Sequence, residues 1–163
     1  MKSLDDIFGE YEEKKAAEAR AAEEKQERER AERVASGQLL GSVILPVAQK
    51  FVAEINEKGH KAELLDYTMG GQAYPHIILK FTPVPKTSAR HYSGYVGASK
   101  LTFMHRDGGV VNVSIEISTA RSGSAWDGYS GSRNGTDFKP EQITEEWATK
   151  QVLMFVEAAL RVN

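Results

Sequence analysis

The sequence contains no cysteine, few prolines and no long apolar run. The absence of cysteine among its 163 residues excludes disulfides, thiol catalysis and sites that need a thiolate ligand, such as iron–sulfur clusters. The N-terminal segment MKSLDDIFGEYEEKK lacks the apolar core of a signal peptide, and no run of about 18 apolar residues occurs. We therefore expect a soluble, cytoplasmic protein.

Signatures of catalysis and of cofactor binding are also missing. The chain contains no GxxxxGK[ST], no GxGxxG after a strand, no GxSxG and no HExxH motif. Its histidines, His60, His76, His91 and His105, are isolated in sequence, and none has a second ligand at metal spacing. The formal net charge of −2 requires no acidic partner. We expect a protein that is not an enzyme and that uses no metal and no cofactor.

Residues 1 to 35 are expected to form a charged helical appendage. Glu, Lys, Arg and Ala fill most of this segment, so helix propensity is high and material for a core is scarce. Ser3 and Asp6 have the spacing of a capping box at a helix start. The heptad frame that begins at Leu4 soon places charged residues in the seam, which favours a solvated single helix over a coiled coil.

The tip of this helix differs from the rest because it carries an apolar stripe at helical spacing. Such a stripe predicts a docking element for another protein. The alternatives are that it packs on the chain's own domain, or that it stays mobile near the terminus. Its members are Leu4, Ile7, Phe8 and Tyr11.

Residues 36 to 163 are expected to form one domain, because Ser36-Gly37 interrupts the charged helix and apolar residues become frequent after it. A helix with a broad apolar face should end at Lys58, with Gly59 as its C-cap. Pro46 marks either a kink after Leu45 or the first turn of a new helix. A last helix over residues 139 to 162 should turn one face inward, comprising Val152, Phe155, Val156 and Ala159.

Four strands are expected between these helices, at residues 61 to 69, at residues 76 to 82 and in a hairpin over residues 100 to 118. The order helix, four strands, helix predicts an α+β fold, a two-layer domain in which both helices cover one face of an antiparallel sheet. The buried face should carry Leu65, Ile77, Phe81, Leu101, Phe103, Val113 and Ile115.

The other face of the sheet should be solvated unless a partner covers it. Its polar members are Lys80, Lys100, Thr102, Asn112, Ser114 and Glu116. Ile78 and Met104 are the apolar candidates on this face for contact with a partner.

The register of the hairpin follows from its alternation of apolar and polar residues. A two-residue loop would pair Phe103 with a polar residue. A three-residue loop, Asp107 to Gly109, pairs Phe103 with Val113 and Lys100 with Glu116, and it puts glycine at a left-handed position. We prefer this register, with a loop from Arg106 to Gly108 as the second choice.

Two long connections, residues 83 to 97 and 119 to 138, combine cationic with aromatic side chains. Connections of this length are usually functional or disordered. In an up-and-down antiparallel sheet both leave the same edge, so they should be neighbours. We predict that they form a ligand- or partner-binding site from Lys86, Arg90, His91, Tyr92, Tyr95, Arg121, Trp126, Tyr129 and Arg133.

These features favour a non-catalytic interaction or adaptor protein that binds another protein through the paired loops and the helix tip. The first alternative is a nucleic-acid-binding module that uses the same loops. A weaker alternative is an enzyme acting on a phosphorylated or anionic small molecule. A homodimer with a continuous sheet is a further option, and we expect no membrane partner.

Overall fold

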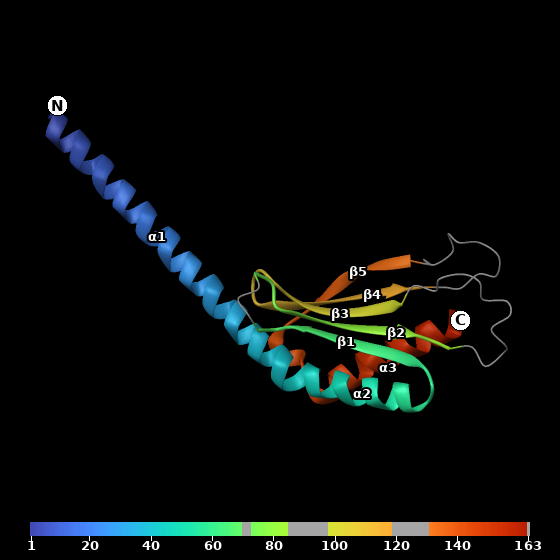
Figure 1. The fold of residues 1–163 in the computed structure, drawn as a ribbon. Coiled ribbons are helices and arrows are strands. Elements are labelled where there is room, and N and C mark those ends of the chain that lie inside the picture. Colours follow the sequence, from blue (N-terminus) through green and yellow to red (C-terminus); the bar gives the residue numbers. More distant parts are fainter. Residues whose placement is uncertain (70–72, 85–97, 119–130, 163) are drawn as a thin grey trace.

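The computed structural model describes residues 1–69, 73–84, 98–118 and 131–162. A long helix leads into a domain built from a five-stranded sheet and two helices (Figure 1). The elements in chain order are α1 (Leu4–Leu39), the π-helical turn η1 (Leu40–Ile44), α2 (Leu45–Glu57), β1 (Lys61–Tyr67), β2 (His76–Thr82), β3 (Ser99–Arg106), β4 (Val110–Ile117), β5 (Gly131–Phe138), the 3₁₀ turn η3 (Pro140–Gln142) and α3 (Glu145–Val162).

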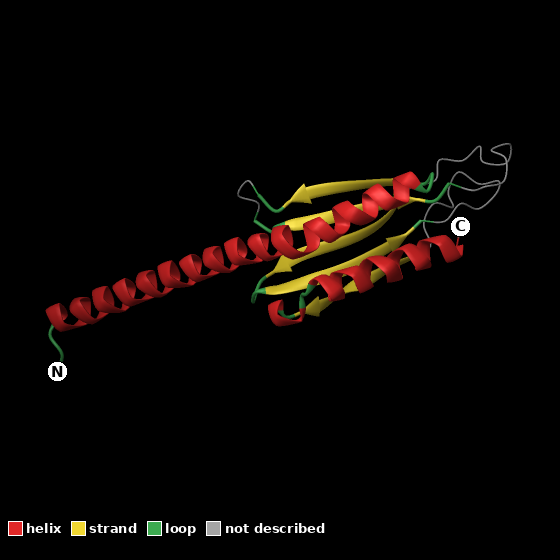
Figure 2. Ribbon diagram, turned by 90° about the horizontal axis from the view of Figure 1, so that it is seen from below, coloured by secondary structure: helices red, strands yellow, loops and turns green. Residues whose placement is uncertain are grey.

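The sheet has the order β1-β2-β3-β4-β5, and every neighbouring pair is antiparallel. The helices α2 and α3 lie side by side on one face of it (Figure 2). No element of the described part of the chain covers the other face, which we call the open face (Figure 1). The predicted α+β class and two-layer arrangement are confirmed, but the sheet has five strands rather than four. β5 lies in a segment that we expected to be a loop. The prediction missed this strand because a strand can pair through its main chain without an alternating apolar pattern in its sequence.

The hairpin has the preferred register. Phe103 pairs with Val113, Lys100 pairs with Glu116, and the loop comprises Asp107 to Gly109. Gly109 has a φ angle of 75°, in the left-handed region that glycine adopts without strain. On the open face, Lys100 Nζ lies 3.8 Å from Glu116 Oε2.

The face assignment of β1 was wrong by one residue. Leu64 pairs with Leu79 and faces the core, whereas Leu65 pairs with Ile78 on the open face. Both leucines are half-buried, so their apolar character alone does not distinguish them. The register of β1 against β2 determines which leucine faces the core, because a shift of one residue moves every side chain of a strand to the other face.

The core lies between the inner sheet face and the two helices. Phe81 and Phe103 of the sheet and Phe155 of α3 are fully buried, and the rings of Phe81 and Phe155 meet edge to face with centroids 6.4 Å apart. Val152 and Ala159 are also fully buried, which confirms the predicted inner face of α3. Burial of large side chains of this kind supplies most of the driving force for folding.

Ser36 and Gly37 do not interrupt the helix, contrary to our expectation. α1 continues to Leu39 and passes through η1 directly into α2. Both residues are buried, so tertiary packing compensates for the low helix propensity of glycine. Pro46 is the second residue of α2, which directly follows the π-helical turn η1, so the helix continues through it and no new helix begins there. Irregular turns of this kind are where a helix accommodates a proline, which lacks the N–H.

Asn112 is not solvated, although it belongs to the open face. It is 6% exposed, and its Nδ2 donates a hydrogen bond to Asp137 Oδ1 over 2.6 Å. The register of β5 against β4 shifts between Val113 and Ile115, and such a bulge bends a strand locally. β5 therefore covers Asn112, and no strand was expected at its position.

The continuous helix Leu4–Glu57 meets a length and composition criterion for a membrane span, with a mean hydropathy of 1.2 over 18 residues. This window is 28% buried. Leu40, Ile44 and Val47 of the same helix belong to the domain core. A core helix of a water-soluble protein satisfies the same criterion, so the helix is only weak support for a membrane span.

Candidate protein-docking site

Residues 1 to 28, which we call the arm, are all exposed. They extend away from the domain as the first part of α1 (Figure 1). The helical part, residues 4 to 28, spans about 37 Å at about 1.5 Å per residue. The arm therefore holds its tip far from the sheet.

A capping box determines where the arm becomes helical. Asp6 N donates to Ser3 Oγ over 3.2 Å, and Ser3 N donates to Asp6 Oδ2 over 2.9 Å. The Ser3 hydroxyl donates to Asp6 Oδ2 over 2.7 Å, and this bond, together with the one from Ser3 N, lowers the pKa of the Asp6 carboxyl group. The start of the helix is thus specified immediately before the apolar stripe.

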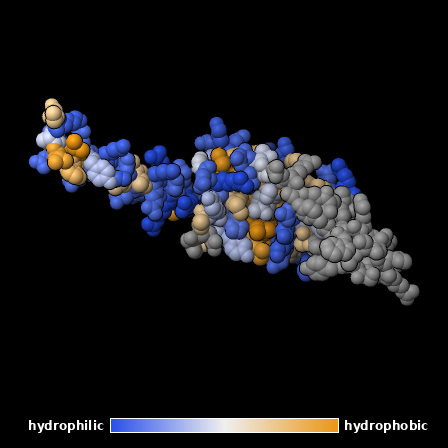
Figure 3. Space-filling view, turned by 90° about the horizontal axis from the view of Figure 1, so that it is seen from above, coloured by the Kyte–Doolittle hydropathy of each residue, from blue (hydrophilic) through white to orange (hydrophobic). Residues whose placement is uncertain are grey.

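The four apolar residues of the tip are uncovered. Leu4 is 71% exposed, Ile7 51%, Phe8 60% and Tyr11 57%. Figure 3 shows hydrophobic side chains gathered at the end of the arm. The alternative in which the stripe packs on the chain's own domain is therefore not what the structure adopts, and docking to another protein stays a prediction.

The stripe points to the same side of the helix as the residues that hold α1 to the domain. Leu4 and Leu40 are 36 positions apart, which corresponds to about ten turns of 3.6 residues. Leu40 is fully buried and belongs to the core beneath the sheet. The stripe and the open face of the sheet are accordingly visible from the same direction (Figure 3).

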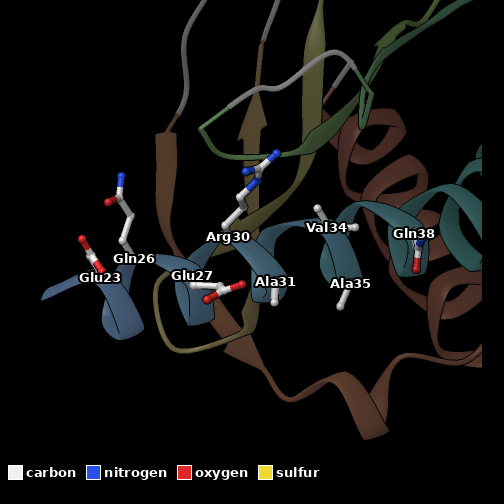
Figure 4. Close-up of a pocket in the computed structure, with 8 residues that line it drawn as sticks. All are labelled: Glu23, Gln26, Glu27, Arg30, Ala31, Val34, Ala35 and Gln38. Atoms are coloured by element: carbon white, nitrogen blue, oxygen red, sulfur yellow. The ribbon is translucent and has the colours of Figure 1, made fainter. Parts of the chain in front are cut away.

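The base of α1 also carries a shallow furrow of about 770 Å³. In Figure 4, Arg30 and Val34 point to one side of the helix, and Ala31 and Ala35 point to the other. Its lining residues are Glu23, Gln26, Glu27, Arg30, Ala31, Val34, Ala35 and Gln38. All of the lining residues in the described part of the chain come from one helix, so within that part the furrow is a surface of α1.

The predicted loop site lies largely outside the described residues. Only Arg133 falls in a described element, the backbone of β5. The strand ends that anchor the two connections do meet at one end of the sheet, since Ser118 N donates to Ser99 Oγ over 2.9 Å. The residues outside the described ranges are Lys86, Arg90, His91, Tyr92, Tyr95, Arg121, Trp126 and Tyr129.

The open face of the sheet carries an aromatic pair that sequence reasoning missed. Tyr67 and His76 face each other across β1 and β2 and stack with ring centroids 4.6 Å apart. The alternation of side chains along β1 could have predicted this pair, but we had assigned the side chains of β1 to the wrong faces of the sheet. Lys80 Nζ on this face lies 4.0 Å from Glu63 Oε2, so both Lys80 and Lys100 of the open face have a carboxylate partner.

A hollow of about 470 Å³ opens at the end of this face, lined by a residue just before β2, by the end of β3 and the turn after it, and by β5. It is lined by Tyr74, Met104, Arg106, Asp107 and Asp137. Tyr74 Oη donates to Asp107 Oδ2 over 3.4 Å. The lining contains one cation and two carboxylates, which gives no preference for an anionic ligand.

Within the described ranges, no group of three or more His, Cys, Asp or Glu side chains is arranged to hold a metal ion. The uncovered stripe at the tip of α1 is therefore the surface feature with the clearest physical interpretation. Comparisons with family models, with curated proteins and with solved structures found no match to this chain.

Proposed function

We propose that this protein is a non-catalytic adaptor that captures another protein with the tip of its N-terminal helix. One observation carries the proposal: four large apolar side chains are exposed on one side of a capped helix. Their spacing, i, i+3, i+4 and i+7, is the spacing of anchors in helices that dock into an apolar groove. Exposed apolar clusters of this kind mark interaction sites more often than isolated exposed residues do.

The rest of the arm suits this role because it supplies reach without a competing apolar surface. Its stabilising contacts are ion pairs such as the exposed Lys15–Glu18 pair at 3.4 Å, and Lys25 pairs at 3.9 Å with Glu29, just beyond the arm. Such pairs stabilise a helix only weakly. The arm is thus a spacer whose only large apolar residues lie at its end.

The charge around the stripe indicates the chemistry of the partner. Asp5, Asp6, Glu12 and Glu13 flank the stripe and are exposed, and Lys2 is paired with Glu10. Lys14 and Lys15 also lie next to the stripe, and Lys15 Nζ is 5.7 Å from the centroid of the Tyr11 ring. Residues 1 to 15 carry five carboxylates against three lysines, and this acidic excess is complemented by an apolar groove with an excess of basic residues at its edge. We infer a protein partner with such a groove, contacted by the loops of the domain as a second surface.

Site-specific photo-crosslinking tests the proposal on the full-length chain. A photoreactive amino acid in place of Tyr11 should crosslink the partner in cells, because position 11 lies in the stripe. The matched control is the same amino acid in place of Ala17, which is equally part of the exposed arm but lies on another side of the helix. Equal crosslinking from both positions, or none from Tyr11, would refute capture by the stripe.

A further inference from the structure

The arm leaves the domain through a close, buried junction. Ser36 is 4% exposed, and Gly37 beside it is also buried. A Cβ atom at Gly37 would lie 2.9 Å from the Thr68 carbonyl oxygen and 3.6 Å from Pro75 Cβ. The backbone of α1 therefore packs directly against the residues between β1 and β2, and only small residues permit this approach.

His105 ties the helix to the sheet at this junction. It lies near the end of β3 on the inner face and is 1% exposed. Its Nδ1 lies 2.7 Å from Ser36 Oγ, and its backbone N–H donates to the Pro75 carbonyl oxygen over 2.9 Å. One buried residue thus bonds both α1 and the connection between β1 and β2.

The charge state of His105 affects the stability of this junction, because the side chain is buried away from water. Burial lowers the pKa of His105 and is the largest effect. The carboxylates of Asp107 and Glu32 raise this pKa, and the Arg33 guanidinium lowers it. Asp107 belongs to the turn after β3, and Glu32 and Arg33 belong to α1. The net effect keeps the ring neutral at neutral pH, and a proton added to it would place a charge in the interior.

The helix is packed against the domain after the junction and is mostly exposed to solvent before it. Leu40 and Ile44 of η1 are fully buried, so the helix is anchored from residue 40 onward. The arm before the junction is exposed. Gly37 lies between the two parts, and glycine is the residue at which a helix bends at least cost, since it favours the helix by about 1 kcal/mol less than alanine.

We propose that Ser36 and His105 form an acid-sensitive latch, which holds the arm in one direction and releases it to pivot at Gly37 when His105 is protonated. The protonated Nδ1–H still donates to Ser36 Oγ, so the release comes from the cost of burying the charged ring, which falls when the arm swings away and water reaches it. The released arm stays helical, because its capping box and ion pairs do not involve the junction. The latch controls the direction in which the arm holds the apolar stripe, so its biological role rests on the proposed function. Its structural test needs no partner, so either proposal can fail without the other.

Distance measurement between two spin labels tests the latch in the full-length protein. The chain has no native cysteine, so Ala16→Cys and Lys61→Cys attach labels only to the exposed arm and to exposed β1. We expect one narrow distance distribution at about pH 7.5 and a clearly broader one once the pH falls below the midpoint at which the His105 ring itself titrates, which burial places below the usual histidine pKa of about 6.5. An unchanged distribution at the lower pH would overturn the proposal.

Two variants distinguish the latch from general acid effects. His105→Asn retains a polar group near the position of Nδ1 but does not titrate, so its distribution should be narrow at both pH values. Ser36→Ala removes the hydrogen bond, so its distribution should already be broad at about pH 7.5. Broadening of His105→Asn at low pH to the same extent as the parent, or a narrow distribution for Ser36→Ala at both values, would contradict the latch.

The titration of His105 itself provides a measurement that does not depend on either variant folding. Its ring resonances should shift with the same midpoint as the broadening of the distance distribution. If the broadening instead follows the carboxylates, near their usual pKa of about 4, protonation of His105 is not the trigger. Circular dichroism at each pH establishes whether the helices remain folded during the transition.

Discussion

Asn112 lies directly beneath Gly135, so closely that a Cβ atom at position 135 would stand 1.9 Å from Asn112 Oδ1. The two residues belong to β4 and β5, where the register shifts between the strands. Glycine at position 135 allows the backbone of β5 to cover the Asn112 side chain, which bonds Asp137. This relationship explains how a polar residue on the open face becomes buried.

Gly135→Ala should therefore lower the free energy of unfolding by about 1–3 kcal/mol, the usual cost of forcing extra atoms into a packed site. Urea denaturation measures this cost. In an Asn112→Ala background the same change should cost much less, because the atoms that the new methyl group meets are gone. An equal cost in both backgrounds would mean that Asn112 does not set the need for glycine.

The two faces of β4 should differ sharply in their tolerance of charge. Val113 is 6% exposed in the core, so Val113→Asp buries an unpaired carboxylate and should unfold the domain. Ser114, half-exposed on the open face, should accept the same change within about 0.5 kcal/mol. Thermal unfolding followed by circular dichroism checks both variants, and equal melting temperatures would contradict the face assignment.

The apolar stripe should contribute little to stability. Ile7 and Phe8 are more than half exposed, so replacing both by Ser should change the free energy of unfolding by no more than about 0.5 kcal/mol. The same double variant should abolish crosslinking from position 11, since buried anchors carry most of the energy of such interfaces. A drop of several degrees in melting temperature would instead indicate that the tip packs on its own domain.

Stability should fall on the acid side of neutrality because of His105. Its pKa is lowered in the folded protein, so the unfolded chain binds a proton first as the pH falls. The contribution is fully present above the unfolded pKa of about 6.5 and decreases as the pH drops through that value toward the folded pKa. Denaturation midpoints from about pH 8 to pH 5 should show this decrease, and His105→Asn should reduce it. An identical pH profile for the variant would exclude His105 as the cause.

The sequence by itself determined the features that depend on near neighbours. The capping box of Ser3 and Asp6, the hairpin loop that ends at Gly109 and the apolar stripe of the tip are all local patterns. They could be predicted because helix caps, turn geometry and side-chain periodicity act over a few residues. The α+β class followed from the order of these local elements.

Tertiary structure alone decided the remaining features. Leu64 and Leu65 are equally apolar, and only pairing with β2 selects which one faces the core. β5 has no alternating apolar pattern in its sequence and is held by main-chain pairing with β4, so the sequence alone did not predict a strand there. Ser36 and His105 are 69 positions apart, and their contact exists only because α1 packs over the end of β3. Burial at that junction outweighs the local preference of Gly37, so the helix continues where the sequence indicated a break.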